Sequence, residues 1–193
     1  NIYRDPFLLT NTSLAGNDSK IMAVDYNIDG QQDVFISGHG GQHLYKNNNT
    51  DFIESQMDFS SVQLSPSHIK SADIINDGYP DILLVGQNSY NVSLDFLFYL
   101  KNKNGLLVLD TLQNIPLNID DPFSFTDYNN DGKTDILIGN KLYRNIGNKK
   151  FIFQALIGND PVVSSWADYD QDGDLDVAIG SKIFRNDANN IFM

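Results

Sequence analysis

Short apolar runs alternate along the chain with clusters of polar turn residues. Four of these runs, at residues 34–37, 82–85, 136–138 and 177–179, contain three or four residues, and a glycine follows each one. The runs are rich in β-branched and aromatic side chains and are bounded by Gly, Asn and Asp, which indicates strands rather than helices. We therefore predict an all-β chain.

Three blocks recur four times in the same order. The first is a nine-residue loop with Asp at positions 1, 5 and 9 and Gly at position 6, the second is the apolar run, and the third has the form Leu-Tyr-Arg-Asn. The loops are residues 25–33, 73–81, 127–135 and 168–176, and the third blocks end at Asn47, Asn102, Asn145 and Asn186. Their spacing of roughly 40 to 50 residues suits the blade of a β-propeller.

Each repeat supplies four predicted antiparallel strands. Strand A ends at the first Asp of the loop, strand B is the apolar run, strand C carries the third block, and strand D follows a turn rich in Asn and Gly. One such unit per period defines a propeller of four-stranded blades. We assign the repeats to residues 14–61, 62–115, 116–157 and 158–193 of one propeller, with 1–13 as the end of a preceding blade. About four blades in a chain that starts within a blade indicate part of a larger propeller, with a small ring of four or five blades as the alternative.

The composition argues against binding to nucleic acid and against membrane insertion. The chain has 25 acidic and 13 basic residues, a net charge of −12 and no cysteine, and Glu54 is the only glutamate. This charge is unsuited to nucleic acid and is repelled by anionic membranes. No apolar stretch approaches the roughly 18 residues that cross a bilayer, so we expect no membrane insertion. A chain whose acids are almost all Asp has them in loops, because Asp prefers turns and caps.

The nine-residue loop has the chemistry of a calcium site. Oxygen ligands at positions 1, 3 and 5, a Gly at 6 and a backbone carbonyl at 7 match the first half of an EF-hand loop. Position 12 is apolar in all four copies, so we predict that the Asp at position 9 closes the site. Mg²⁺ is a poorer fit to so many protein oxygens. The predicted ligands are Asp25, Asn27, Asp29, Gln31 and Asp33; Asp73, Asp77 and Asp81, with the carbonyl of Tyr79; Asp127, Asn129, Asp131, Lys133 and Asp135; and Asp168, Asp170, Asp172, Asp174 and Asp176.

The alternative is an ordinary Asp-Gly hairpin without metal. In four copies that alternative crowds several carboxylates together with nothing to neutralise them, which destabilises the fold at neutral pH. Calcium is therefore favoured. Position 3 is Asp170 in the fourth loop, Asn in the first and third, and Ile75 in the second. We predict three calcium sites, strongest in the fourth loop, with the second weak or empty.

Four features occur together in this chain: the loop pattern Asp-x-[Asp/Asn]-x-Asp-Gly-x-x-Asp, the apolar strand to Gly, the block Leu-Tyr-Arg-Asn, and the turn Gly-x-x-x-Phe. Together they resemble the FG-GAP or VCBS repeat, as in the heads of integrin α-subunits. The resemblance covers nearly the whole chain and is loosest in the second copy. It implies a propeller, usually of seven blades, with calcium between strands A and B. It also implies a role in adhesion, ligand binding or scaffolding, and rarely catalysis.

The longest B–C loops, residues 38–43 and 87–95, are predicted to lie on the face opposite calcium, where long loops on a rigid scaffold suit binding. The alternative, slightly favoured for either loop taken alone, is a neutral insertion in a solvent-exposed hairpin. A metal pair at His39 and His43 is disfavoured because no third ligand stands out, and His68 and Trp166 are predicted to be structural. Glycosylation sequons occur at Asn11, Asn17, Asn48 and Asn91.

No nucleophile or phosphate-binding motif is present in the sequence, so we predict that the chain is not an enzyme. The favoured function is a calcium-stabilised, secreted or cell-surface recognition module that binds a protein or glycan. The alternatives are a structural subunit of a larger surface assembly and a non-catalytic domain of a secreted hydrolase.

Overall fold

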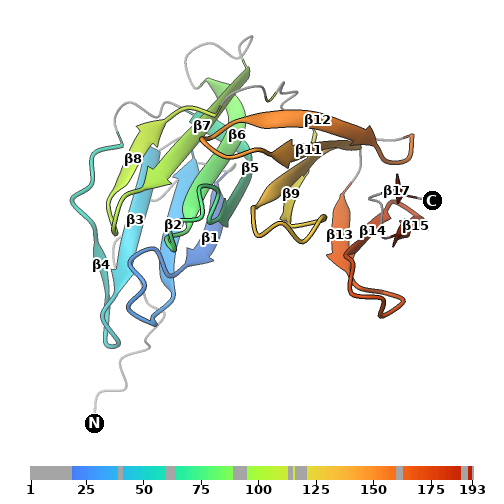
Figure 1. The fold of residues 1–193 in the computed structure, drawn as a ribbon. Helices are drawn as coiled ribbons and strands as arrows, with labels where there is room; N and C mark the ends of the chain where they lie inside the picture. The colour runs from blue at the N-terminus through green and yellow to red at the C-terminus, as the bar shows by residue number, and fades with distance from the viewer. Residues whose placement is uncertain are drawn as a thin grey trace. The chain divides into compact units, whose positions relative to one another are not determined.

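The computed structural model describes residues 19–38, 41–59, 64–88, 95–112, 115, 121–159, 163–187 and 191–192. The described residues form antiparallel strands joined by turns, and they contain no helix (Figure 1). The fold is the predicted one, all-β and built from successive propeller blades. No helix in the described part of the chain is long and apolar enough to cross a membrane. The chain divides into two compact units, residues up to 71 with 79–110, and residues 72–78 with those from 111 onward.

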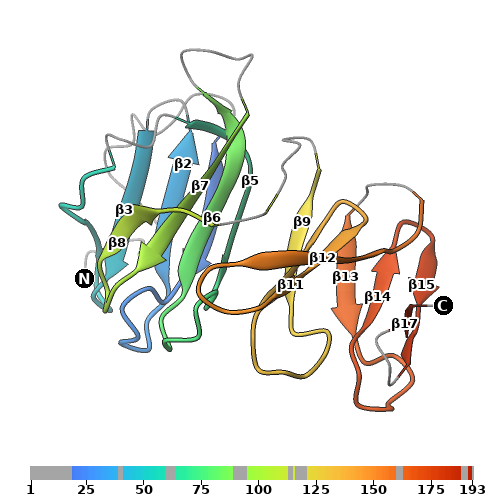
Figure 2. The ribbon, with the colours of Figure 1, turned by 45° about the horizontal axis from the view of Figure 1, so that its top comes forward.

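The first unit contains two four-stranded sheets, each with its strands in sequence order (Figure 2). The first sheet consists of β1 (Lys20–Val24), β2 (Asp33–Gly38), β3 (Gly41–Asn47) and β4 (Phe52–Glu54). The second consists of β5 (Leu64–Ala72), β6 (Asp81–Asn88), β7 (Asp95–Asn102) and β8 (Leu107–Asp110).

The second unit contains the third and fourth blades. The third blade is β9 (Phe123–Thr126), β10 (Asp135–Ile138), β11 (Lys141–Asn145) and β12 (Phe151–Leu156). The fourth blade has β13 (Ser164–Ala167), β14 (Asp176–Ile179) and β15 (Lys182–Phe184) in one sheet, followed by the pair β16 (Asn186–Asp187) and β17 (Ile191–Phe192).

Apolar side chains of successive blades pack face to face, because alternate residues of strand B point to opposite sides of the sheet. In the first unit, Phe35 and Leu44 of the first blade pack with Ile82 and Leu84 of the second. In the second unit, Leu137 and Leu142 of the third blade pack in the same way with Val177 and Ile179 of the fourth. Full burial of each of these side chains contributes about 1.5–3 kcal/mol. Strand B is therefore apolar on the faces that meet a neighbouring blade, whereas Ala178 of β14 is exposed.

The asparagine that ends the third block links neighbouring blades in the second, third and fourth repeats. Asn102, Asn145 and Asn186 are buried, and each donates two hydrogen bonds from Nδ2. One bond reaches the carbonyl at position 2 of the preceding blade's loop, and the other reaches position 8 of its own loop. The acceptors and distances are Tyr26 O (2.6 Å) and Pro80 O (3.0 Å) for Asn102, Ile74 O (2.8 Å) and Thr134 O (3.0 Å) for Asn145, and Tyr128 O (2.8 Å) and Leu175 O (3.2 Å) for Asn186. We call this arrangement the asparagine interlock.

Candidate functional site

The four Asp-rich loops have the same unusual backbone. Position 4 has a positive φ in every copy although it is never glycine, and position 6 is always a glycine with a positive φ. The φ angles at position 4 are 57° at Ile28, 60° at Asn76, 55° at Asn130 and 63° at Gln171. A side chain added at the glycines would meet no atom within 4 Å, so glycine is required there by its backbone angle rather than by space.

The first Asp of each loop holds this turn in place. In the first loop, the Asp25 carboxylate accepts hydrogen bonds from the backbone N–H groups of Asp29 (3.1 Å) and Gly30 (2.9 Å). The same pair of bonds ties Asp73 to Asp77 and Gly78, and Asp127 to Asp131 and Gly132. In the fourth loop, Gly173 N donates to Asp168 Oδ2 at 3.2 Å. The loop is therefore already shaped by its own hydrogen bonds.

The ninth Asp is buried and connects the loop to strand C. One of its oxygens, Oδ1, accepts the backbone N–H of the asparagine that ends the third block in every blade. The pairs are Asn47 to Asp33 (2.8 Å), Asn102 to Asp81 (2.7 Å), Asn145 to Asp135 (2.7 Å) and Asn186 to Asp176 (2.8 Å). The sequence predicted a metal ligand at this position, and the structure adds this structural role, which the sequence analysis missed.

The second oxygen of the ninth Asp is a candidate cation ligand in the first and third loops, whereas in the fourth loop Asp176 Oδ2 accepts the Tyr169 N–H at 2.9 Å. Oδ2 of Asp33 and of Asp135 is buried and has no hydrogen-bond partner. Burial, opposed by the Asn145 N–H and aided by the charges of Asp131 and Asp127, raises the pKa of Asp135 to about 7. Burial also raises the pKa of Asp33. A buried carboxylate oxygen without a partner, beside further carboxylates, is a donor set suited to a hard cation such as Ca²⁺.

The fourth loop brings its carboxylates closest together. Oxygens of Asp168, Asp170 and Asp176 all lie within 4.8 Å of one another, so this cluster could hold a metal ion. The pKa of Asp170 is raised by desolvation and then by the charges of Asp172 and Asp176. Arg185 Nε lies 3.8 Å from Asp170, but the guanidinium makes its short contact with Asp187, at 2.8 Å.

The first and third loops each have a lysine on the Asp at position 5. Lys46 Nζ lies 3.1 Å from Asp29, and Lys133 Nζ lies 3.3 Å from Asp131. The hydrogen bond from Lys46 lowers the pKa of the Asp29 carboxyl, and the same bond raises the pKa of Lys46. These loops therefore have part of their negative charge neutralised by the protein itself.

The second loop lacks a ligand at position 3, where Ile75 stands. Asp73 still shapes the turn, and Asp81 still accepts the N–H of Asn102. Asp81 Oδ2 also accepts a bond from the Tyr99 hydroxyl at 2.9 Å. This oxygen therefore has a protein partner where the corresponding oxygens of Asp33 and Asp135 have none.

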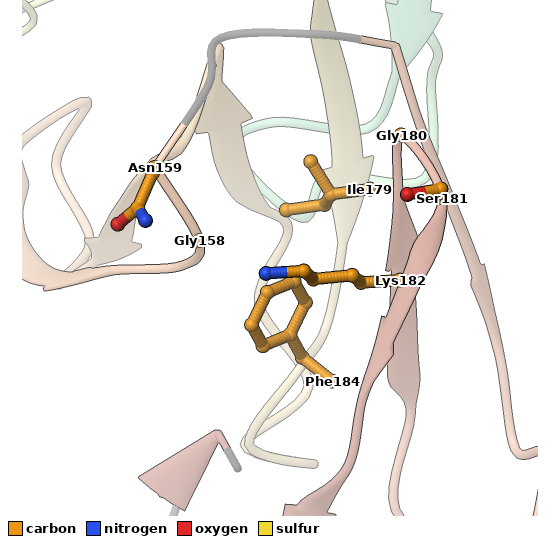
Figure 3. A pocket seen from close by; sticks show the side chains of 7 residues that line it. All are labelled: Gly158, Asn159, Ile179, Gly180, Ser181, Lys182 and Phe184. Carbon is orange, nitrogen blue, oxygen red and sulfur yellow. The ribbon is translucent and has the colours of Figure 1, made fainter.

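A pocket of about 250 Å³ lies between the third and fourth blades, at the strand ends opposite the Asp-rich loops of the second unit. It is lined by the turn after β12 and by the hairpin between β14 and β15, with Gly158, Asn159, Ile179, Gly180, Ser181, Lys182 and Phe184. Figure 3 shows the side chains of Ile179, Lys182 and Phe184 on one side and Asn159 on the other. Asn140 Nδ2 donates to Gly158 O at 3.1 Å, and the Phe184 ring lies against Gly158, so this wall is held in place.

The remaining sequence candidates have local partners or lie outside the described residues. His43 Nδ1 is 2.6 Å from Glu54 Oε1, and Trp166 Nε1 donates to Ser124 Oγ at 3.0 Å. His68 also has an interaction partner. His39, most of the loop 87–95 and the sequons at Asn11, Asn17 and Asn91 lie outside the described residues.

The sequence matches the FG-GAP-like repeat family over residues 25–84 and 127–179, and the chain belongs to this family. No curated protein matches it. Among solved structures it is similar to a lectin of Agrocybe aegerita that recognises non-reducing terminal N-acetylglucosamine, with a TM-score of 0.68 and 18% identity, covering 91% of this chain and 51% of the lectin chain. It is also similar to part of the Tc holotoxin pore of Photorhabdus luminescens, with a TM-score of 0.56 and 20% identity, covering 96% of this chain and 9% of that chain. The chain thus spans about half of the matched lectin chain.

The sequence carries no signal for this pocket. The long B–C loops of the first two repeats stay a predicted binding site, and the pocket uses the short hairpin of the fourth blade and the turn that precedes this blade. Its lining is drawn from two blades, and no spacing in the sequence signals which turns of different blades meet.

Proposed function

We propose that this chain is a non-enzymatic, calcium-stabilised recognition module that binds a sugar residue of a glycan in the pocket between the third and fourth blades. It acts outside the cell, where calcium is high enough to fill loops of this kind. The observation that carries the proposal is the lining of the pocket. Asn159, Ser181 and Lys182 offer an amide, a hydroxyl and an ammonium group, and Phe184 offers an aromatic ring.

This lining suits a sugar. The polar groups can donate to and accept from ring hydroxyls, and the aromatic ring gives the apolar face of a pyranose a surface to pack on. Ligand pockets for drug-sized molecules begin at about 300 Å³. A volume of about 250 Å³ therefore fits one sugar unit at the end of a chain better than a larger ligand.

The similar lectin adds support, because its chain has this fold and recognises terminal N-acetylglucosamine. Its identity to this chain is low, so the likeness extends to the fold and leaves the identity of the sugar to be measured.

A glycan array in calcium-containing buffer tests the proposal. Binding to glycans with a terminal sugar such as N-acetylglucosamine should fall by about tenfold or more in Asn159→Ala and in Lys182→Ala, because each removes a polar contact from the pocket. Lys141→Ala is the matched control, since Lys141 begins β11 of the third blade as Lys182 begins β15 of the fourth. Equal loss in the control, or no glycan binding by the wild-type chain, would contradict the proposal.

A further inference from the structure

Within the described residues, the three polar side chains that line the pocket between the third and fourth blades have no protein partner. Neither the Asn159 amide nor the Ser181 hydroxyl makes a hydrogen bond there, and the Lys182 ammonium makes no ion pair. In the same unit, Lys133 and Arg185 lie 3.3 Å and 2.8 Å from neighbouring carboxylates. Figure 3 shows the Lys182 side chain extending toward the side of the pocket that carries Asn159. The polar groups of the pocket are therefore available to a ligand.

A tight hairpin fixes where the hydroxyl and the ammonium stand. Lys182 pairs with the last residue of β14, so only Gly180 and Ser181 form the turn. Two-residue turns of this kind hold their flanking strands in a defined register. The third blade has the same turn, but there Asn140, which stands where Ser181 stands in the fourth blade, donates to Gly158 O at 3.1 Å. The polar side chain of the turn is thus used by the protein in the third blade and is available in the fourth.

The polar groups of the pocket are mainly hydrogen-bond donors. An ammonium has three N–H donors and no acceptor, an amide adds two donors, and a hydroxyl adds one. Among the described lining residues none is acidic, so the acceptors are the Asn159 amide oxygen and the Ser181 hydroxyl oxygen. The hydroxyls of a neutral sugar donate as well as accept, whereas a carboxylate only accepts. The lining therefore matches an acidic sugar better than a neutral one.

The Asp-rich loop of the fourth blade does not cancel the charge of Lys182. This loop ends at Asp176, where β14 begins, and the pocket lies at the other end of the strand, at Ile179. Strand geometry separates these ends by about 10 Å. The Debye length is about 8 Å at physiological ionic strength, so the charges of the loop are largely screened at the pocket. The Lys182 ammonium therefore attracts an anion even though the whole chain has a net charge of −12.

We propose that this pocket is specific for an acidic sugar, a hexuronic acid at the end of a glycan, whose carboxylate accepts hydrogen bonds from the Lys182 ammonium and the Ser181 hydroxyl. The inference rests on the proposed function and names the class of sugar that the pocket takes. A hexuronic acid has a carboxylate where a neutral hexose has a hydroxymethyl group, so the two sugars are nearly equal in size. A hexuronic acid therefore fits a volume of about 250 Å³. A sulfated hexose and a sialic acid carry an anionic group on a larger sugar.

Titration calorimetry in calcium buffer compares three sets of glycans, which end in a hexuronic acid, in its uncharged methyl ester, or in the neutral hexose of the same configuration. The acid should bind about tenfold or more tightly than the other two, because a charge-assisted hydrogen bond is roughly twice as strong as a neutral one. Lys182→Gln removes the charge and keeps a polar side chain, so the ratio of the affinities should fall to about one. Lys182→Arg should keep the preference. Lys141→Gln, at the same position of the third-blade hairpin, is the matched control and should leave the ratio unchanged.

The outcomes separate this inference from the proposed function. If the wild-type chain binds neutral hexoses or N-acetylglucosamine as tightly as the hexuronic acid, the preference for an acidic sugar is wrong and the sugar pocket stands. A preference that survives Lys182→Gln, or tighter binding of sulfated or sialic acid glycans than of the hexuronic acid, would also overturn the assignment. If no glycan binds at all, both the inference and the proposed function fail. Thermal unfolding of each variant checks that it is folded.

Discussion

The first and fourth loops have the same backbone and differ in how their carboxylates are balanced. Both have a left-handed residue at position 4, a glycine at position 6 and a first Asp that accepts the glycine N–H. In the first loop Lys46 reaches Asp29, and position 3 is an asparagine. In the fourth loop position 3 is Asp170, and three carboxylates lie within 4.8 Å of one another. The hydrogen bonds that shape such a loop are thus separate from the charges that could hold a cation.

The largest expected effect is the loss of calcium from the fourth loop. A ligand at a thousand times its dissociation constant stabilises by about 4 kcal/mol, and 1 kcal/mol corresponds to about 2–4 °C in a chain of this size. A chelator should therefore lower the melting temperature by roughly 10 °C. Asp170→Asn should reduce this shift, because it removes one carboxylate from the cluster.

Ile75→Ala is the control, since it changes position 3 of the loop predicted to be weak or empty. Calorimetric calcium titrations of both variants complete the comparison. If Ile75→Ala loses as much calcium binding as Asp170→Asn, the predicted order of the sites is wrong. If the chelator leaves the melting temperature unchanged, the predicted stabilisation by calcium is wrong.

The pH dependence of stability tests the charge balance of the third loop, which like the first has a lysine on the Asp at position 5. The folded-state pKa of Asp135 is about 7, above the ordinary value of 3.8, so the folded protein binds this proton more tightly than the unfolded chain does. The resulting stability is fully present below about pH 4 and is lost as the pH rises through 7. In chelator, the unfolding free energy contributed by this group should fall by about 2 kcal/mol between pH 5 and 8.

Denaturant unfolding at several pH values measures this change. Asp135→Asn should remove it, and saturating calcium should flatten it in the wild-type chain by replacing the proton. Asp51→Asn, which removes an exposed carboxylate, should keep the wild-type pH profile. If the pH profile of Asp135→Asn is the same as that of the wild type, this carboxylate is not the source of the pH dependence.

A smaller effect, this time a gain in stability, is expected from a substitution at position 4 of the first loop. Ile28 is β-branched and has a φ of 57°, and its side chain is mostly exposed. A left-handed conformation costs such a residue about 1–2 kcal/mol, while asparagine adopts it far more readily. Ile28→Asn should therefore stabilise the protein by about 1 kcal/mol. Gln171→Asn, the same change in the fourth loop, should stabilise less because glutamine is not β-branched. Equal gains would mean that β-branching is not the cause.

The repeats and their strands could be predicted from the sequence because the information is local, while calcium binding in the loops stays a prediction. Asp at positions 1, 5 and 9 and Gly at 6 defined the loop, and the apolar run after it defined strand B. The second role of the ninth Asp was not visible, because its partner, the Asn145 N–H in the third blade, lies ten residues away on another strand. The asparagine recurred plainly, but its acceptor, such as Tyr26 O for Asn102, is 76 residues distant. Contacts between blades depend on packing that spacing alone does not encode.

The smallest effect expected concerns the lysine that distinguishes the first loop. Calcium must displace the Lys46 ammonium from Asp29, so Lys46→Gln should raise the calcium affinity of this loop by roughly two- to fivefold, the equivalent of an exposed ion pair. The gain should shrink in high salt, which already screens the pair. Calorimetric titration in an Asp170→Asn background makes the first loop easier to observe. Lys101 precedes Asn102 as Lys46 precedes Asn47, but it belongs to the blade whose loop has Ile75, so Lys101→Gln should leave the titration unchanged. If both substitutions raise the affinity equally, the effect comes from net charge, and the ion pair does not set the difference between the first and fourth loops.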